Sequence, residues 1–197
     1  TIYNLEVSDA NGCSTSPLST DFDIDTIAPI VPAATLSTHT LTYNISCFGM
    51  NDGAIFASAI GGIGTFEYSI DGGTTYQPSQ TFSGLLAGTY TITYKDANDC
   101  TADTVVTLIE PPNLSGTAII SAGVSCAGVA NGEITFDVDP LNPGVPPYQY
   151  STDNGAFYQS SANFTNLAGD NSYSVMIEDN NGCQHTSTVY LAEPAAI

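Results

Sequence analysis

The chain has 197 residues, 42% of them hydrophobic and 11% charged, and its 20 acidic residues against a single Lys or Arg give a formal net charge of −19. Binding to nucleic-acid phosphates needs Lys and Arg, so this composition argues against nucleic acid as a partner, and it disfavours anionic membrane surfaces for the same reason. No apolar run is long enough to span a bilayer, so we expect no direct membrane insertion.

The segment at residues 1–13 recurs twice, ending at Cys100 and at Cys183. In each copy apolar and polar residues alternate, which predicts a half-buried strand, and a turn then reverses the chain into a second strand. The residues that recur in register are Tyr3, Asp9, Asn11 and Cys13; Tyr90, Asp96, Asn98 and Cys100; and Tyr173, Asp179, Asn181 and Cys183. Such a period predicts a tandem array of one small domain.

The linker at residues 21–32 carries Asp21, Asp23 and Asp25 in alternation with apolar residues. On a strand these carboxylates would stack on one face about 7 Å apart. Calcium bound between domains is one interpretation, since hard cations prefer carboxylate oxygens, and a solvated strand face is the other. Asp96 and Asp179 allow the same calcium hypothesis, or their side chains bond to their own backbone in a hairpin turn.

A second set of matching residues marks where each repeat begins. Cys47 opens CFGMNDGAI and Cys126 opens CAGVANGEI, and each unit closes on a proline signal, IEPP at 109–112 and AEP at 192–194. We therefore expect the last part of one repeat with its linker at 1–32, a full repeat at 33–111, and a second full repeat with the start of the next linker at 112–197.

Turn signals every eight to twelve residues predict an all-β fold of tandem immunoglobulin-like antiparallel β-sandwich repeats. Asp71-Gly72-Gly73 and Asp153-Asn154-Gly155 are typical of tight hairpin turns, which need adjacent residues with positive φ. Leu85 through Gly88 to Tyr90 predicts a tyrosine corner, and the second repeat has one more residue before Tyr173.

The cysteines predict one disulfide in each repeat. Cys47–Cys100 and Cys126–Cys183 are the expected pairs, because each takes the same two positions of its repeat. Cys13 corresponds to Cys100, so its partner would lie in an earlier part of its own repeat, or it would be a free or intermolecular thiol. Disulfides indicate an oxidising compartment.

These motifs together resemble a known family. The pattern C-x-G-x-x-D/N-G-x-I, then Y-x-Y-S, L-x-x-G-x-Y, D-x-N-x-C and a closing E-P is similar to the SprB repeat. That resemblance implies a segment of a very long cell-surface adhesin of gliding bacteria, secreted by the type IX system. Two stretches depart from the pattern, the linker DFDIDTIAPIVPAATLS and the insertion DPLNPGVPP at 139–147. Asp25-Thr26-Ile27 and Asp103-Thr104-Val105 resemble the O-glycosylation pattern of that bacterial group, which makes Thr26 and Thr104 candidate sites.

The expected function is a non-enzymatic stalk module of an extracellular adhesin or filament, whose partners are neighbouring repeats, copies of itself or surface polysaccharide. A carbohydrate-binding module is the first alternative, in which Tyr76, Tyr158 or Phe157 would stack on sugars. Aromatics exposed along one face would favour it, and aromatics buried between sheets would favour the stalk. The second alternative is a filament subunit in which residues 1–30 complete a neighbour by strand addition. Apart from possible calcium, we expect no cofactor.

Overall fold

The computed structural model describes residues 9–11, 26–39 and 42–195, and the regular elements in these ranges are all strands. None of the described residues forms a helix of the length and apolarity needed to cross a membrane. The all-β class expected from the turn spacing is therefore confirmed. The linker aspartates at 21–25 and Cys13 lie outside the described residues.

The described residues form twelve strands, which make two units of six. The first unit contains β1 (Val31–Leu36), β2 (Gly53–Ile60), β3 (Glu67–Ser69), β4 (Thr81–Leu85), β5 (Gly88–Lys95) and β6 (Thr101–Leu108). The second unit contains β7 (Leu114–Ala122), β8 (Gly132–Pro143), β9 (Gln149–Ser151), β10 (Asn163–Leu167), β11 (Asn171–Glu178) and β12 (Gln184–Leu191). The repeat boundary expected between residues 111 and 112 falls in the connection from β6 to β7.

Each unit is a sandwich of two three-stranded antiparallel sheets. The sheets of the first unit have the strand orders β1-β2-β4 and β3-β5-β6, and the second unit repeats this arrangement with β7-β8-β10 and β9-β11-β12. Their inner faces meet in one core per unit, with Ile55 and Tyr94 from opposite sheets fully buried in the first and Ile134 and Ile177 in the second. Burying one side chain of this size stabilises the fold by about 1.5–3 kcal/mol.

Alternation in the recurring segment produces the inner face of β5. Ile92 and Tyr94 are fully buried and Thr91 is exposed as the alternation predicts, but Thr93 between Ile92 and Tyr94 is buried as well. The Tyr94 hydroxyl donates to the carbonyl of Ala33 on the opposite sheet at 2.6 Å, and burial raises the pKa of Tyr94 to about 12. The segment therefore packs in the core, and Tyr94 ties the two sheets together.

Both predicted tyrosine corners are present. The Tyr90 hydroxyl donates to Leu86 O at 2.9 Å, and the Tyr173 hydroxyl donates to Ala168 O at 2.9 Å. The extra residue before Tyr173 lengthens the corner by one position and leaves its hydrogen bond unchanged.

The glycine turns have the predicted backbone but not the predicted size. Gly72 and Gly73 both have positive φ, at 72° and 81°. However, Tyr68 and Gln77 exchange both backbone hydrogen bonds, so the loop spans residues 69–76 instead of forming a two-residue turn. The Asp71 carboxylate fills this wider loop by accepting the Ser69 hydroxyl at 2.6 Å and the amides of Thr74 and Thr75. The second unit has the same loop between Tyr150 and Gln159.

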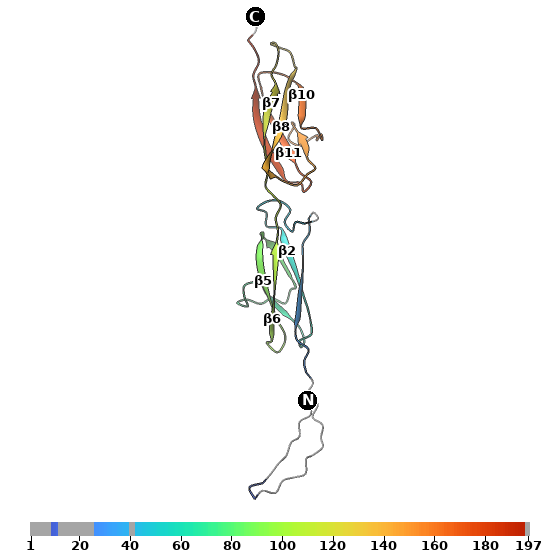
Figure 1. Ribbon diagram of the computed structural model, residues 1–197, viewed down its shortest axis with the longest axis vertical. Coiled ribbons are helices and arrows are strands. Elements are labelled where there is room, and N and C mark those ends of the chain that lie inside the picture. Colours follow the sequence, from blue (N-terminus) through green and yellow to red (C-terminus); the bar gives the residue numbers. More distant parts are fainter. Residues whose placement is uncertain (1–8, 12–25, 40–41, 196–197) are drawn as a thin grey trace.

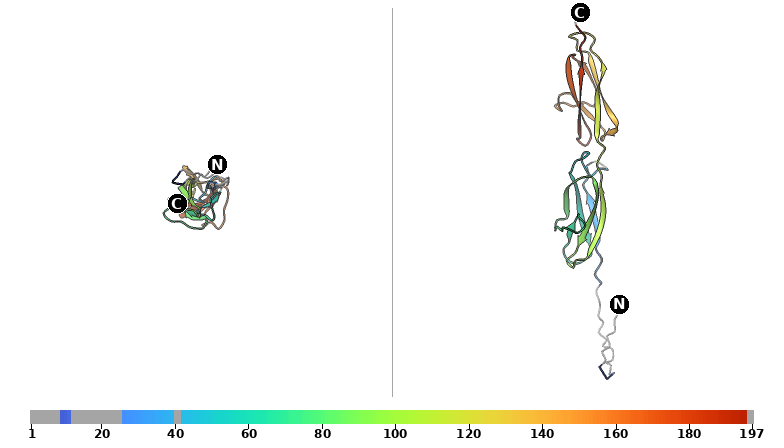
Figure 2. Two further views of the ribbon diagram at one scale, coloured as in Figure 1. Left: turned by 90° about the horizontal axis from the view of Figure 1, so that it is seen from below. Right: turned by 90° about the vertical axis from the view of Figure 1, so that its left-hand side faces the viewer.

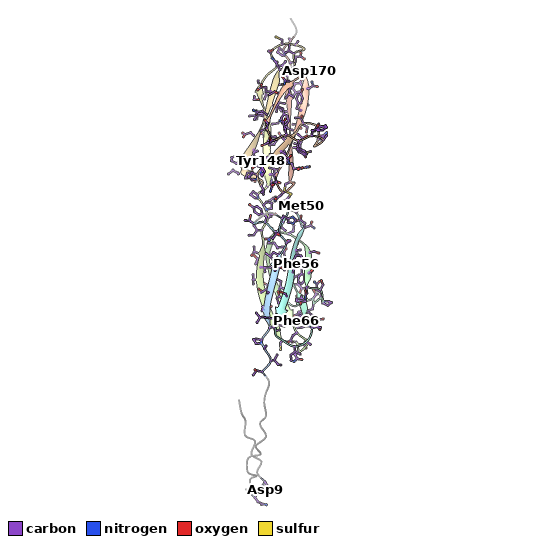
Figure 3. All side chains as sticks on the ribbon, turned by 90° about the vertical axis from the view of Figure 1, so that its right-hand side faces the viewer. Asp9, Met50, Phe56, Phe66, Tyr148 and Asp170 are labelled. Carbon is purple, nitrogen blue, oxygen red and sulfur yellow. A yellow bond between two sulfur atoms is a disulfide. The ribbon has the colours of Figure 1, made fainter. Side chains whose placement is uncertain are left out.

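The two units stand end to end along the long axis of the molecule (Figures 1 and 2). In Figure 3, Met50 and Tyr148 lie where the units meet, Phe66 lies at the other end of the first unit, and Asp170 lies toward the outer end of the second. Each unit therefore has two poles, one facing its neighbour and one facing outward.

Candidate functional site at the junction between the units

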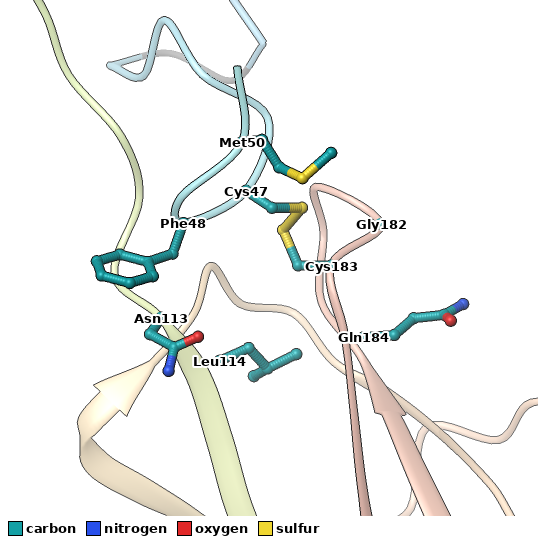
Figure 4. Close-up of a pocket in the computed structure, with 8 residues that line it drawn as sticks. All are labelled: Cys47, Phe48, Met50, Asn113, Leu114, Gly182, Cys183 and Gln184. Atoms are coloured by element: carbon teal, nitrogen blue, oxygen red, sulfur yellow. A yellow bond between two sulfur atoms is a disulfide. The ribbon is translucent and has the colours of Figure 1, made fainter. Parts of the chain in front are cut away.

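The junction brings together two loops that lie at opposite poles of a repeat. The first unit contributes residues 44–52, which we call its cysteine loop, and the second unit contributes the turn of the β11–β12 hairpin at residues 179–183, its hairpin turn. Cys47 and Cys183 form a disulfide across the junction, with a Cα–Cα distance of 5.7 Å (Figure 4). A hydrogen bond from Asn181 Nδ2 to Ser46 O at 2.9 Å lies beside it.

The disulfide pairs predicted within each repeat are wrong. Cys47 bonds Cys183 of the other unit, and Cys100 and Cys126 are exposed free thiols. The reason is the length of the hairpin strands. The eight residues of β6 extend about 26 Å from the hairpin turn at residues 96–100 to the cysteine loop, whereas a disulfide needs Cα atoms about 4.4–6.8 Å apart. The two cysteines of one repeat therefore lie at its opposite poles.

The hairpin turn is held by a buried aspartate. Asp179 is 5% exposed, and its carboxylate accepts the backbone amides of Asn181 at 2.8 Å, Cys183 at 3.0 Å and Val145 at 2.8 Å. Val145 belongs to the insertion at 139–147, so the insertion packs on the turn that carries Cys183.

Asp96 has the same role in the first unit. It is 3% exposed and accepts the amides of Asn98, Cys100 and Ile63 at 2.9–3.0 Å. Burial acts to raise the pKa of Asp96, but these hydrogen bonds outweigh it, and the pKa lies below its usual value. The Asx-turn interpretation thus accounts for the contacts of Asp96 and Asp179. Within the described ranges no three His, Cys, Asp or Glu side chains gather as a metal site would require. Calcium at Asp21, Asp23 and Asp25 stays a prediction.

The cysteine loop is fixed by the glutamate of the closing E-P signal. Glu110 Oε2 accepts the amide of Gly49 at 2.7 Å, and Glu193 accepts the amide of Gly128 in the second unit. Gly49 has a φ of 74° and Gly128 of 76°, a backbone that favours glycine. E-P was interpreted only as the closing signal of each unit, and this contact was not predicted, although C-x-G and E-P occur together in both repeats.

The linker between the two units, residues 109–113, is hydrogen-bonded to both of them. Asn44 Oδ1 accepts the amide of Ile109 at 2.9 Å, and Ile109 O accepts the amide of Asn44 at 2.8 Å. Pro111 is fully buried, and Asn113 O accepts the amide of Gly144 in the second unit at 3.1 Å. The units are consequently joined by the disulfide and by a linker that packs on either side.

An open hollow of about 320 Å³ flanks the disulfide, with Phe48, Met50 and Leu114 as apolar walls and Asn113 and Gln184 as polar ones (Figure 4). A second hollow of about 320 Å³ lies beside Asp137, Asp139 and His185. Hydrogen bonds from Asn142 and Leu141 lower the pKa of Asp139, which favours its charged form and makes it unsuited to general acid catalysis.

The remaining candidate residues are dispersed. Thr26 is exposed and Thr104 is half-buried on β6. Tyr76 lies under Lys95, whose Nζ is 4.3 Å from the ring centroid, and the Tyr158 hydroxyl donates to Glu178 at 3.1 Å. Phe157 is 80% exposed. Other large aromatics, including Tyr68, Tyr94, Phe136 and Tyr150, are buried between the sheets.

Similar solved structures share few residues with this chain. The three N-terminal domains of the bacteriophage RB49 highly immunogenic outer capsid protein are 13% identical, with a TM-score of 0.42, over 83% of this chain and 59% of theirs. A C-terminal 282-residue fragment of intimin, in complex with the intimin-binding domain of its translocated receptor, is 14% identical, with a TM-score of 0.40, over 84% and 64%. Domains 4 and 5 of the S-layer protein SbsC are 14% identical, with a TM-score of 0.33, over 84% and 100%. The chain spans less than two thirds of the first two structures. No curated protein matches it.

A family model matches once in each unit. The SprB repeat model covers residues 41–75 and 119–157. Each stretch begins ahead of a cysteine loop and ends within the wide loop that follows Y-x-Y-S, so it contains two of the motifs that carry the resemblance. Residues 41–75 and 119–157 thus match the SprB repeat, one stretch in each unit.

Proposed function

We propose that this chain is a non-enzymatic stalk module of a secreted cell-surface adhesin or filament, which holds an adhesive tip away from the cell. The observation that carries the proposal is the Cys47–Cys183 disulfide between successive repeats. A bond inside a domain stabilises that domain, whereas a bond between domains fixes their relative orientation, which is what a spacer requires.

Two connections cross the junction. The linker at residues 109–113 bonds to both units, and its buried Pro111 restricts the backbone. The disulfide adds a covalent tie beside it, and the Asn181–Ser46 hydrogen bond accompanies that tie. Two units joined by one flexible strand would swing freely, so this double connection supports a stiff rod.

The composition fits a location outside the cell. Disulfides persist in oxidising compartments. The net charge of −19 keeps such a chain soluble through self-repulsion. The SprB repeats fit a structural module of a cell-surface protein. Secretion by the type IX system and a role in gliding belong to the proposal.

Small-angle X-ray scattering tests the stalk. The oxidised chain should scatter as a rod, with an extended pair-distance distribution. The Cys183→Ser variant should keep its secondary structure but show the scattering of two units on a flexible joint. The matched Cys100→Ser variant, altered at the equivalent cysteine of the other unit, should scatter like the unaltered chain. A compact particle with the units side by side would refute the stalk. Identical scattering from the Cys183→Ser variant would refute the role of the disulfide in fixing the relative orientation of the units.

One observation favours the alternative of a carbohydrate-binding module, the exposed ring of Phe157. Sugars stack on such rings. Binding of a panel of surface polysaccharides, measured by isothermal titration, should then be lost in Phe157→Ala. The aromatics buried between the sheets support the stalk instead. The strand-addition hypothesis concerns residues 1–30, most of which lie outside the described residues.

A further inference from the structure

The outer poles of the two units carry free cysteines at the same positions as the two that are bonded. Cys126 lies at the outer pole of the second unit and is equivalent to Cys47, which lies at the junction pole of the first. Cys100 lies at the outer pole of the first unit and is equivalent to Cys183, which lies at the junction pole of the second. Each outer pole therefore presents one half of the observed disulfide.

The cysteine loop of the second unit has the backbone of the bonded one. Asn131 Oδ1 accepts the amide of Ser125 at 3.0 Å, and Asp52 Oδ1 accepts the amide of Ser46 at 3.1 Å. The backbone bond that closes the loop runs from Val129 N to Cys126 O at 3.2 Å, and from Met50 N to Cys47 O at 3.1 Å. Cys126 is therefore held in the conformation in which Cys47 is bonded.

The outer pole of the first unit likewise matches the pole that the second unit contributes to the junction. Asp96 organises the Cys100 turn as Asp179 organises the Cys183 turn. The incoming linker is placed alike in the two units, since the amide of Gly62 donates to Ala28 O at 2.9 Å and that of Gly144 donates to Asn113 O at 3.1 Å. Among the described residues no cysteine loop packs against this pole, and Asp99 precedes Cys100 where Gly182 precedes Cys183.

Charge opposes contact between two such poles only a little. The stretch at residues 121–132, which contains the cysteine loop of the second unit, has no charged residue of its own, and Glu193 accepts the amide of its Gly128. On the other pole the buried Asp96 carboxylate faces its own turn, and the exposed Asp99 beside Cys100 lies 3.8 Å from Lys95 Nζ. In a chain with a net charge of −19, an uncharged loop is a surface on which an acidic hairpin can dock. Ala127 and Val129 replace Phe48 and Met50 there, so the docked surface is less bulky.

We propose that the outer poles are docking surfaces for further repeats of this kind, with Cys126 bonding the hairpin-turn cysteine of one neighbour and Cys100 the cysteine-loop residue of the other. This inference extends the stalk function and rests on it. Each junction of the array would then repeat the Cys47–Cys183 bond, and the two cysteines of any one repeat would bond different neighbours.

The bond forms by thiol–disulfide exchange with a small disulfide such as oxidised glutathione. The Cys100 thiolate attacks one glutathione sulfur, forms a mixed disulfide and releases one glutathione thiolate. The Cys126 thiolate of the neighbour then attacks the Cys100 sulfur and displaces the second glutathione thiolate. The two protein thiols lose two electrons and two protons, and oxidised glutathione gains them to become two thiols.

Two variants of the whole chain isolate this pairing. The first variant carries Cys13→Ser and Cys100→Ser, which leaves Cys126 as its free thiol. The second variant carries Cys13→Ser and Cys126→Ser, which leaves Cys100 as its free thiol. One variant carries ¹⁵N, and the two are mixed in equal amounts in a glutathione redox buffer and quenched by alkylation. Non-reducing intact mass then counts mixed dimers and like dimers. Random pairing yields as many mixed dimers as like dimers.

We expect mixed dimers to exceed like dimers by about fivefold, which corresponds to a preference of about 1 kcal/mol. Asn98→Ala in the second variant removes the amide equivalent to that of Asn181, and the excess should fall toward the random ratio. Random pairing, an excess that Asn98→Ala leaves unchanged, or the absence of dimers would overturn the proposal. The stalk function would survive each of these results if the oxidised single chain still scattered as a rod.

Discussion

The two units share the hydrogen bonds of their hairpin turns, and they differ in the charge at one strand position. Lys95 at the end of β5 lies 2.8 Å from Glu67 and above the ring of Tyr76. Glu178 at the same position of β11 accepts hydrogen bonds from Tyr158 and Gln184. The tyrosine keeps its place while its partner reverses charge. The strand position is therefore set by backbone pairing and core packing, and the surface contact adapts to it.

The units differ again at their hairpin turns, where Cys183 is bonded and Cys100 is free. The turns themselves have the same aspartate contacts, so the difference lies in what faces them. Equivalent residues of the two units thus serve as controls for one another. We expect the change in stability on substitution to decrease from the disulfide, through the turn aspartates and tyrosine corners, to the surface charge.

The largest expected effect follows loss of the disulfide. Cys183→Ser should lower the free energy of unfolding in urea by up to about 5 kcal/mol, because the bond closes a loop across 136 positions of sequence. Cys100→Ser removes an exposed free thiol and should change the unfolding free energy by less than about 0.5 kcal/mol. Equal effects of the two substitutions on the free energy of unfolding would contradict this, because they would show that Cys183, like Cys100, is not bonded within the chain.

Loss of a turn aspartate should come next. Asp179→Ala leaves three backbone amides without their acceptor, and we expect it to destabilise the second unit by about 3 kcal/mol. Asp103→Ala on the exposed side of β6 is the control and should stay within about 0.5 kcal/mol.

Calcium titration of the unaltered chain provides a second readout. A melting temperature that rises more with calcium than with sodium at matched ionic strength would mean that the aspartates also hold a cation.

The tyrosine corners should contribute equally in the two units. Tyr90→Phe and Tyr173→Phe each remove one hydrogen bond of 2.9 Å, and each should cost about 1 kcal/mol. Hydrogen exchange, resolved by peptide, can assign the loss to the altered unit. Exchange that increases in the unaltered unit as well would argue against two independent cores.

The smallest effect is expected from the reversed charge. The hydrogen bond to Glu67 and the nearby negative charges raise the pKa of Lys95, so it is charged at neutral pH. Lys95→Gln should lower the melting temperature slightly in dilute buffer, and the difference should shrink in high salt because an exposed ion pair is screened. A difference that persists in high salt would indicate that packing of the lysine stem on Tyr76 matters more than its charge.

Local patterns predicted most of the fold. Alternation around Ile92 marked an inner strand face, and Leu85 to Tyr90 marked the corner, because each depends on residues close in sequence. The size of the Asp71 loop was not predictable in the same way, since it depends on a backbone exchange between Tyr68 and Gln77 that no turn motif encodes.

The disulfide was missed for a different reason. Cys47 and Cys100 occupy the same positions in the first repeat as Cys126 and Cys183 occupy in the second, and that regularity suggested pairs within a repeat. The regularity fits pairs between successive repeats equally well. The length of the strand between the two cysteines of one repeat decides between these two pairings. Because β6 is eight residues long and extended, it places the two cysteines of one unit at opposite poles.

Mapping the disulfides of the native chain tests the central claim most directly. Digestion with pepsin under non-reducing, acidic conditions, which suppress thiol exchange, should release one linked pair of peptides that contains Cys47 and Cys183. Cys100 and Cys126 should be recovered as thiols from chain kept monomeric before digestion. A Cys47–Cys100 or Cys126–Cys183 peptide would contradict the account, because it would place both cysteines of a repeat at one pole and leave the junction without its covalent tie.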